Sequence, residues 1–216
     1  MSRCSWSPRG RPRSLRPHRP RRPGRPRDAA PARRPAPYIA FAGLLEPRKD
    51  VPTLVRAFAR VARDRPELRL VLAGRDGWGA AAVRDAVASS GVTSRVLRPG
   101  FVPDDALPAL YRQAEVVAYP SLVEGFGLPV LEALTCGTPL VTTRGSAMEE
   151  VAGEAALLVP PGDAGALAEA LDRVLTDPDL AARLRRAGPA RAASFTWAAS
   201  AEGHVDAYRV AAGVAA

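Results

Sequence analysis

The stretch EVVAYPSLVEGFGLPVLEALTCGTPLVTT, residues 115–143, contains an apolar run, a glycine-rich turn, a short apolar helix and a second apolar run. The first run, 115–121, is apolar at its centre without alternation, as expected of a strand buried on both faces. Pro129 suits the first turn of a helix, and a second strand follows at 139–143. Strands of this kind joined through helices are typical of a parallel sheet covered on both faces.

The same alternation of strands and helices extends in both directions from this stretch. The sequence predicts strands over 38–44, 68–74, 95–102, 115–121, 139–143 and 154–160. It predicts helices over 51–64, 79–90, 104–114 and 129–136, a helical turn over 147–153, and further helices over 163–177, 178–195 and 196–213. We therefore predict an α/β fold over residues 38–212, a Rossmann-like doubly wound parallel sheet with C-terminal helices.

Residues 1–37 differ in composition from the rest of the chain. They contain 12 arginines, one acidic residue and 9 of the 22 prolines, so they hold more positive charge than the net +9 of the whole chain. No apolar periodicity is present, and we predict that this tail is disordered. It is either a basic arm for nucleic acid or anionic lipid, or an extension without a binding role. We favour the second interpretation, and expect no nucleic-acid partner, because no aromatic interleaving or helical face organises the charge.

Several classes of protein are disfavoured by the sequence. Cys4 and Cys136 have no ligand spacing around them, so we expect neither a disulfide nor a metal site. The absence of G-x-G-x-x-G after the first strand, and of a Walker loop, disfavours dehydrogenases and the usual kinases and ATPases. We also expect no secretory signal, no transit peptide and no membrane span. The expected location is the cytoplasm, with peripheral contact at the inner membrane face as a further expectation.

The loop after the first predicted strand, GLLEPRKD at 43–50, contains an unusual pair of cations. Gly43 allows the backbone to turn closely over the sheet edge, and Arg48 and Lys49 stand just before a helix N-terminus, where the helix dipole favours negative charge. An anionic ligand would resolve this conflict. Lys49 is also the one lysine in a chain that otherwise uses arginine. The alternative is that both are solvated surface charges.

The glycine-rich turn of the opening stretch has a carboxylate on each side. Gly125 and Gly127 leave backbone N–H groups accessible before the helix, which suits a diphosphate. Glu124 and Glu132 would repel phosphate but can accept hydrogen bonds from hydroxyl groups. A ligand with hydroxyls at both ends and a diphosphate between them is a nucleotide sugar. The structural alternative is a surface loop glutamate at 124 and a first-turn glutamate at 132.

Four segments together resemble a known family: YPSLVEGFGLPVLEALTCGTPLVTT (119–143), AGLLEPRKD (42–50), GFVPDDALPALYRQAEVVAYPS (100–121) and EVAGEAALLVPPGD (150–163). They are similar to the C-terminal, donor-binding lobe of the GT-B retaining glycosyltransferases of family four, the glycosyl transferases group 1. The resemblance covers about residues 38–210 and includes the family's E-x7-E signature as Glu124 and Glu132.

The resemblance implies a role for each candidate site residue. Glu124 would contact the donor sugar, Glu132 the nucleotide ribose, and Arg48 and Lys49 the diphosphate. The loop with Phe101 and Val102 would line the base. Gly43 and the turn residues Gly125, Phe126, Gly127 and Leu128 would bind substrate beside the diphosphate. Glu124, Arg48 and Lys49 would serve catalysis, with no metal and no cofactor beyond the donor substrate.

The implied activity is transfer of a hexose, with retention at the anomeric carbon, to a glycan or lipid-linked acceptor. Family members also have an N-terminal lobe that binds the acceptor, and here 37 arginine- and proline-rich residues stand in its place. We therefore expect weak or absent transfer by the isolated chain. The alternatives are half of a split enzyme completed by an acceptor lobe in trans, a nucleotide-sugar-binding pseudoenzyme, and a nucleic-acid binder that uses the tail.

Overall fold

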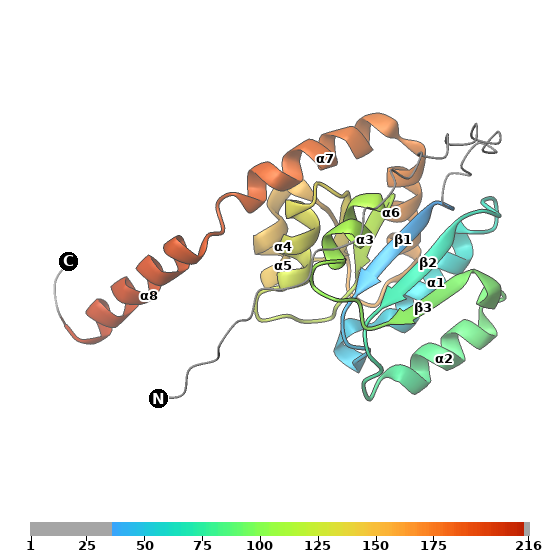
Figure 1. Cartoon of the computed structure of the whole chain (residues 1–216), viewed down its shortest axis with the longest axis horizontal. Helices are drawn as coiled ribbons and strands as arrows, with labels where there is room; N and C mark the ends of the chain where they lie inside the picture. The colour runs from blue at the N-terminus through green and yellow to red at the C-terminus, as the bar shows by residue number, and fades with distance from the viewer. Residues whose placement is uncertain (1–35, 214–216) are drawn as a thin grey trace, which may run out of the picture. The chain divides into compact units, whose positions relative to one another are not determined.

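The computed structural model describes residues 36–213 (Figure 1). Apart from Ala36 and Pro37, the tail predicted to be disordered lies outside the described residues. The strands are β1 (Tyr38–Ala42), β2 (Arg69–Ala73), β3 (Val96–Gly100), β4 (Val116–Tyr119), β5 (Leu140–Thr143) and β6 (Leu157–Val159). The helices are α1 (Val51–Val61), α2 (Ala80–Ser89), α3 (Leu107–Gln113), α4 (Leu128–Thr135), α5 (Ala147–Ala152), α6 (Ala164–Thr176), α7 (Pro178–Ala192) and α8 (Trp197–Ala211).

All six strands join one sheet in the order β3-β2-β1-β4-β5-β6, and every neighbouring pair is parallel. The central strand β1 pairs Ile39 with Leu70 of β2 on one side and with Val116 of β4 on the other. The order reverses at this point, because the chain first builds outward to β3 and then returns to place β4 beside β1. The predicted doubly wound parallel sheet is confirmed.

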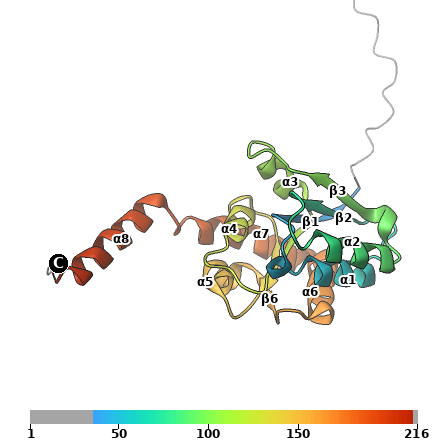
Figure 2. The ribbon, with the colours of Figure 1, turned by 90° about the horizontal axis from the view of Figure 1, so that it is seen from below.

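The helices form two groups that cover the sheet. Helix α1 packs against α2 and α6, whereas α4 packs against α3, α5 and α7, and Figure 2 shows these groups around the strands. Helix α1 illustrates why the sequence folds in this way. Its residues Val51, Leu54, Val55 and Phe58 recur at the spacing of one helix face, and all four are fully buried.

The C-terminal helices differ in how much they bury. Asp163 caps α6 and Asp177 caps α7 through side-chain hydrogen bonds to backbone N–H groups, and both helices contribute buried leucines to the core. Helix α8 is capped by Thr196 but has no buried residue. Across residues 36–213, we find no helix with the length and apolarity that a bilayer crossing would need.

The loops that follow β1 and β2 touch at Gly74. A Cβ atom at this position would lie 1.9 Å from the carbonyl oxygen of Gly43, and the φ angle of Gly74 is +137°. Only glycine fits such a contact. The close approach brings the loop that begins at Arg75 against the loop that begins at Gly43, at the carboxyl edge of the sheet.

Candidate functional site

The loops after β1 and β4 meet at the carboxyl edge of the sheet. These two strands are neighbours whose connections run to opposite sides, which is where doubly wound sheets commonly bind ligands. The backbone N–H of Leu122 donates to the carbonyl oxygen of Arg48 at 2.7 Å, and the Ser121 hydroxyl lies 2.9 Å from the same oxygen. The two loops that the sequence singled out are therefore held directly against each other.

A cluster of two cations and two carboxylates occupies this junction. Arg48 donates from Nε to Glu46 at 2.7 Å and from a terminal nitrogen to Glu124 at 2.5 Å. The ammonium of Lys49 donates to the other oxygen of Glu124 and to the hydroxyl of Tyr119. Lys49 has 7% of its side chain exposed, whereas Arg48 has 43%. Arg48 is thus the cation that a ligand can reach.

Two hydroxyl groups help to orient the Glu124 carboxylate. The Tyr119 hydroxyl accepts from Lys49 and lies 3.1 Å from Glu124 Oε1, and the Ser121 hydroxyl lies 2.8 Å from the same oxygen. Tyr119 and Ser121 are both fully buried. Burial would raise the pKa of Glu124, but hydrogen bonds from Lys49, Ser121 and Arg48 outweigh burial and lower this pKa.

The balance of charge at the junction differs from the expected arrangement. Arg48 and Lys49 were expected to await an external anion, and Glu124 was expected to face ligand hydroxyls. In the structure, Glu46 and Glu124 balance both cations, so the chain itself supplies the opposite charge. The ion pair between Lys49 and Glu124 could not be predicted from a local pattern, because the two residues are 75 positions apart in the chain.

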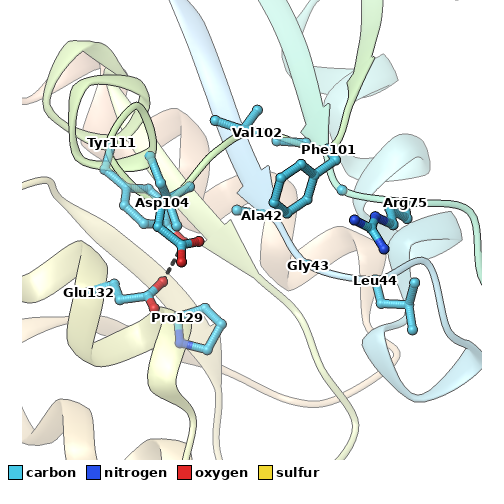
Figure 3. Close-up of a pocket in the computed structure, with 13 residues that line it drawn as sticks. Ala42, Gly43, Leu44, Arg75, Phe101, Val102, Asp104, Tyr111, Pro129 and Glu132 are labelled. Carbon is cyan, nitrogen blue, oxygen red and sulfur yellow. Dashed lines mark hydrogen bonds between the residues drawn. The ribbon is translucent and has the colours of Figure 1, made fainter. Parts of the chain in front are cut away.

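A cavity of about 410 Å³ lies beside this cluster, over the ends of β1, β2 and β3. Figure 3 shows Gly43, Arg75 and Phe101 on one side and Glu132, Pro129 and Tyr111 on the other. The guanidinium of Arg75 lies 4.7 Å from the centre of the Phe101 ring, a cation–π contact. The cavity therefore offers an aromatic ring at one end and carboxylates at the other.

Glu132 projects into the cavity from the second turn of α4. Its Oε2 accepts a hydrogen bond of 3.2 Å from the buried Tyr111 hydroxyl. Burial and the nearby charge of Asp104 raise the pKa of Glu132, and the hydrogen bond from Tyr111 only partly opposes them. The carboxylate is thus held in an environment that favours the approach of a hydrogen-bond donor.

A second cavity, of about 1000 Å³, adjoins the first and is largely apolar. Phe126 and Leu128 line it from the glycine-rich turn, Phe195 lines it from the α7–α8 connection, and Trp197 lines it from the start of α8. Both cavities share Glu132 and Tyr111 in their walls. The Phe126 and Phe195 rings meet edge to face with their centres 5.8 Å apart.

The predicted site residues fall into four groups in the structure. Gly43, Phe101, Val102 and Glu132 line the first cavity, Phe126 and Leu128 line the second, and Arg48, Lys49 and Glu124 form the charged cluster. Gly125 and Gly127 line neither cavity but shape the turn, where Gly127 has a left-handed φ of 96°.

Sequence reasoning missed six residues of the site. They are Glu46, Arg75, Asp104, Tyr111, Tyr119 and Ser121. Arg75 and Asp104 follow predicted strands closely, and that position could have identified them. No local pattern marks the two buried tyrosines as different from core residues. Within the described range, no group of three or more His, Cys, Asp and Glu side chains is placed to hold a metal ion.

Known proteins share this sequence pattern. The family "Glycosyl transferases group 1" matches residues 26–191. The O-antigen chain mannosyltransferase B of Escherichia coli is 33% identical over 174 residues, which cover 80% of this chain and 46% of that protein. The D-inositol 3-phosphate glycosyltransferase of Saccharomonospora viridis is 38% identical over 188 residues, which cover 80% of this chain and 42% of that protein. The chain spans less than half the length of these relatives.

Solved structures share the fold. Sucrose-phosphate synthase from Thermosynechococcus elongatus superimposes with a TM-score of 0.72 at 33% identity, covering 83% of this chain and 46% of that one. Anabaena HepE, solved in complex with UDP-glucose, superimposes with a TM-score of 0.66 at 25% identity, covering 73% of this chain and 44% of that one. Sequence motifs, family match and fold agree, and the chain belongs to the glycosyl transferases group 1.

Proposed function

We propose that the chain is the donor-binding part of a retaining glycosyltransferase, and that the cavity at the carboxyl edge of the sheet binds a nucleotide-diphosphate sugar. The observation that carries the proposal is the placement of Phe101 and Glu132 at opposite ends of one cavity, beside the Arg48 loop. The aromatic end suits a base, and the carboxylate end suits hydroxyl groups. Family membership and the UDP-glucose complex of HepE support the same class of ligand.

The diphosphate would lie between the cavity and the N-terminus of α4. Arg48 uses two of its five N–H donors on Glu46 and Glu124, and its exposure leaves the others free to reach a phosphate oxygen. Lys49 is buried, so we assign it the role of holding Glu124 and contributing positive charge at short range. The first turn of α4, which begins after Gly127, adds a partial positive charge.

The chemistry that we propose is attack by the acceptor hydroxyl on the same face of the sugar that the diphosphate leaves. The carbon–oxygen bond to the leaving diphosphate breaks as negative charge develops on that diphosphate, the acceptor oxygen bonds to the anomeric carbon, and the acceptor proton passes to the departing diphosphate. Arg48 would stabilise this charge, with no metal required by the proposal. Glu124 would accept a hydrogen bond from a hydroxyl group of the transferred hexose, through a lone pair that the cations do not use.

The donor site can be tested by calorimetric titration with UDP, GDP and ADP sugars. We expect one of these classes to bind the wild type, and Glu132→Ala to weaken its affinity by about tenfold or more, because a hydrogen bond to a charged group is lost. Glu154→Ala, a substitution of an exposed glutamate, is the matched control. Absence of binding, or equal affinities for wild type and Glu132→Ala, would contradict the proposed site.

Transfer by this chain alone is expected to be weak or absent, because the chain spans less than half the length of its relatives. The acceptor, a glycan or a lipid-linked sugar, would then meet the donor on a further lobe, encoded with this chain or supplied in trans. Adding a candidate acceptor lobe should raise transfer of labelled sugar if the chain is part of an enzyme. Binding without any transfer under these conditions would favour a regulatory pseudoenzyme instead.

A further inference from the structure

A second carboxylate, that of Asp104, faces the same cavity as Glu132. Asp104 lies in the loop between β3 and α3, while Glu132 lies on α4, and both line the cavity. Figure 3 shows the Asp104 carboxyl group above that of Glu132 in this view, and its dashed line is the hydrogen bond from the Tyr111 hydroxyl to Glu132. The charge of Asp104 is close enough to add to burial in raising the pKa of Glu132. Two carboxylates from different elements therefore converge on one end of the cavity.

Neither carboxylate is balanced by a cation. Among the described residues, Glu132 accepts its one side-chain hydrogen bond from Tyr111, and Asp104 makes no hydrogen bond or ion pair. The other end of the cavity has Arg75, which is occupied with the Phe101 ring. Two like charges facing each other are unfavourable unless donors come between them. The arrangement thus calls for a ligand with two neighbouring donor groups.

The described residues argue against a metal ion as that ligand. A divalent ion needs several oxygen ligands, and no group of three suitable side chains exists in the described part of the chain. A pair of hydroxyl groups on adjacent carbons matches the geometry better, because each hydroxyl can donate to one carboxylate without bringing charge. The loop that supplies Asp104 also supplies Phe101 and Val102, so one short segment faces both parts of a nucleoside.

We propose that Asp104 is a specificity-determining residue, which accepts a hydrogen bond from one hydroxyl of the ribose cis-diol while Glu132 accepts from the other. The inference rests on the proposed function, since it assumes that the cavity binds a nucleotide. The inference adds that the two carboxylates together select ribonucleotides over deoxyribonucleotides. One oxygen of Glu132 already accepts from Tyr111, so the carboxylate of Asp104 offers the diol a further acceptor.

The test is a titration of UDP, GDP and ADP, each with its 2′-deoxy and 3′-deoxy forms, against wild type and Asp104→Ala. We expect the wild type to bind the ribose form about tenfold or more tightly than either deoxy form, because each deoxy form leaves one carboxylate without its donor. Asp104→Ala should lose the preference for one hydroxyl and keep the preference for the other. Asp104 is exposed, so this variant should fold like the wild type, which thermal unfolding will verify.

The neighbouring aspartate provides the matched control. Asp105 is exposed and does not line the cavity, so Asp105→Ala should keep both preferences. An Asp104→Ala variant that weakens all forms equally, has no effect, or changes only the ranking of bases would overturn the inference. If Glu132→Ala loses binding while Asp104→Ala keeps both preferences, only this inference fails. If no nucleotide binds the wild type, the proposed function fails with it.

A pH series separates a direct role from a structural one. The titratable groups that face Glu132 are Asp104, Tyr111, Tyr119 and Cys136. Removing the charge of Asp104 with Asp104→Asn should lower the pKa of Glu132, so the pH below which nucleotide affinity falls should move to lower values. Asp105→Asn should leave this pH unchanged. An unchanged midpoint in Asp104→Asn would mean that the two carboxylates do not act on one ligand.

Discussion

Glu124 and Glu132 lie eight positions apart in one short stretch, yet their surroundings are opposite. Glu124 contacts two cations and two buried hydroxyls, and its pKa is lowered. Glu132 contacts one tyrosine hydroxyl and faces another carboxylate, and its pKa is raised. The folded state therefore favours the charged form of the first glutamate and the protonated form of the second.

The difference separates a group whose charge is balanced within the chain from a group that faces a cavity. The charge of Glu124 is balanced within the chain, because the loops after β1 and β4 bring Glu124 into contact with Arg48 and Lys49. Glu132 accepts a hydrogen bond from Tyr111 through one oxygen, and its side chain lines the cavity. Within one short stretch, the same type of side chain thus joins two loops at one end and lines a cavity at the other.

The comparison would break most clearly if both glutamates mattered equally for stability. Glu124→Gln leaves the buried Lys49 ammonium without its charged partner, and we expect a loss of about 3 kcal/mol in the free energy of unfolding. Denaturant unfolding measures this loss. The exposed Glu154→Gln should cost far less, and Glu132→Gln should not lower the stability at all. A loss for Glu124→Gln no larger than that for Glu154→Gln would show that the cluster is not a stabilising element.

The turn between the two glutamates provides the second test, through its two glycines. Gly127 has a φ of 96°, and a Cβ there would lie 3.0 Å from Met148 Cγ, so Gly127→Ala should cost about 2 kcal/mol in stability. A Cβ at Gly125 would meet open space, and Gly125→Ala should cost less than about 0.5 kcal/mol. Equal thermal shifts for the two variants would mean that the left-handed conformation does not fix the start of α4.

The fold was open to prediction because its signals are local. Apolar runs such as 68–74 and helix faces such as that of α1 each depend on a few neighbouring residues, and the regular alternation then leaves a parallel sheet as the consistent solution. The choice of loops was also predictable, because ligand sites in such sheets lie at the carboxyl ends of strands. Gly43 and Glu132 were found in this way and Phe101 through the family resemblance, and the structure places all three in one cavity.

The pairing of charges was not open to prediction in the same way. Arg48 and Glu124 are 76 residues apart, and their contact depends on the register between two loops that no local pattern encodes. Tyr119 and Tyr111 were equally hidden, because a buried aromatic residue in a strand or helix is usually a core residue. Their hydroxyl groups, which turn each ring into a partner of one glutamate, become visible only with the fold in place.

Ser121 gives a smaller test of the same comparison. Its buried hydroxyl lies between Glu124 Oε1 and the carbonyl oxygen of Arg48, and Ser121→Ala should cost about 1 kcal/mol. The Thr135 hydroxyl, which bonds to a helix carbonyl at the exposed surface, offers the control substitution Thr135→Ala, expected to be near neutral. Because Ser121 helps to lower the pKa of Glu124, Ser121→Ala should also begin to unfold at a higher pH during acid titration.

The smallest effect that we expect is the change in stability of Glu132→Gln, and its sign distinguishes Glu132 from Glu124. The raised pKa of Glu132, caused by burial and Asp104, means that its ionised form costs stability in the folded state near neutral pH. Glu132→Gln removes that cost, so this variant should be slightly more stable than the wild type at neutral pH. The advantage should vanish as the pH falls through the raised pKa, because the wild-type side chain becomes protonated. The pKa of Glu124 is lowered, so the loss of stability in Glu124→Gln should instead be complete above the pKa that Glu124 has in the unfolded chain. This loss should become smaller as the pH falls below that value. Unfolding free energies for both variants across a pH series would measure these trends. Trends of the same sign would mean that the two glutamates share one environment after all, and the division of labour between them would fail.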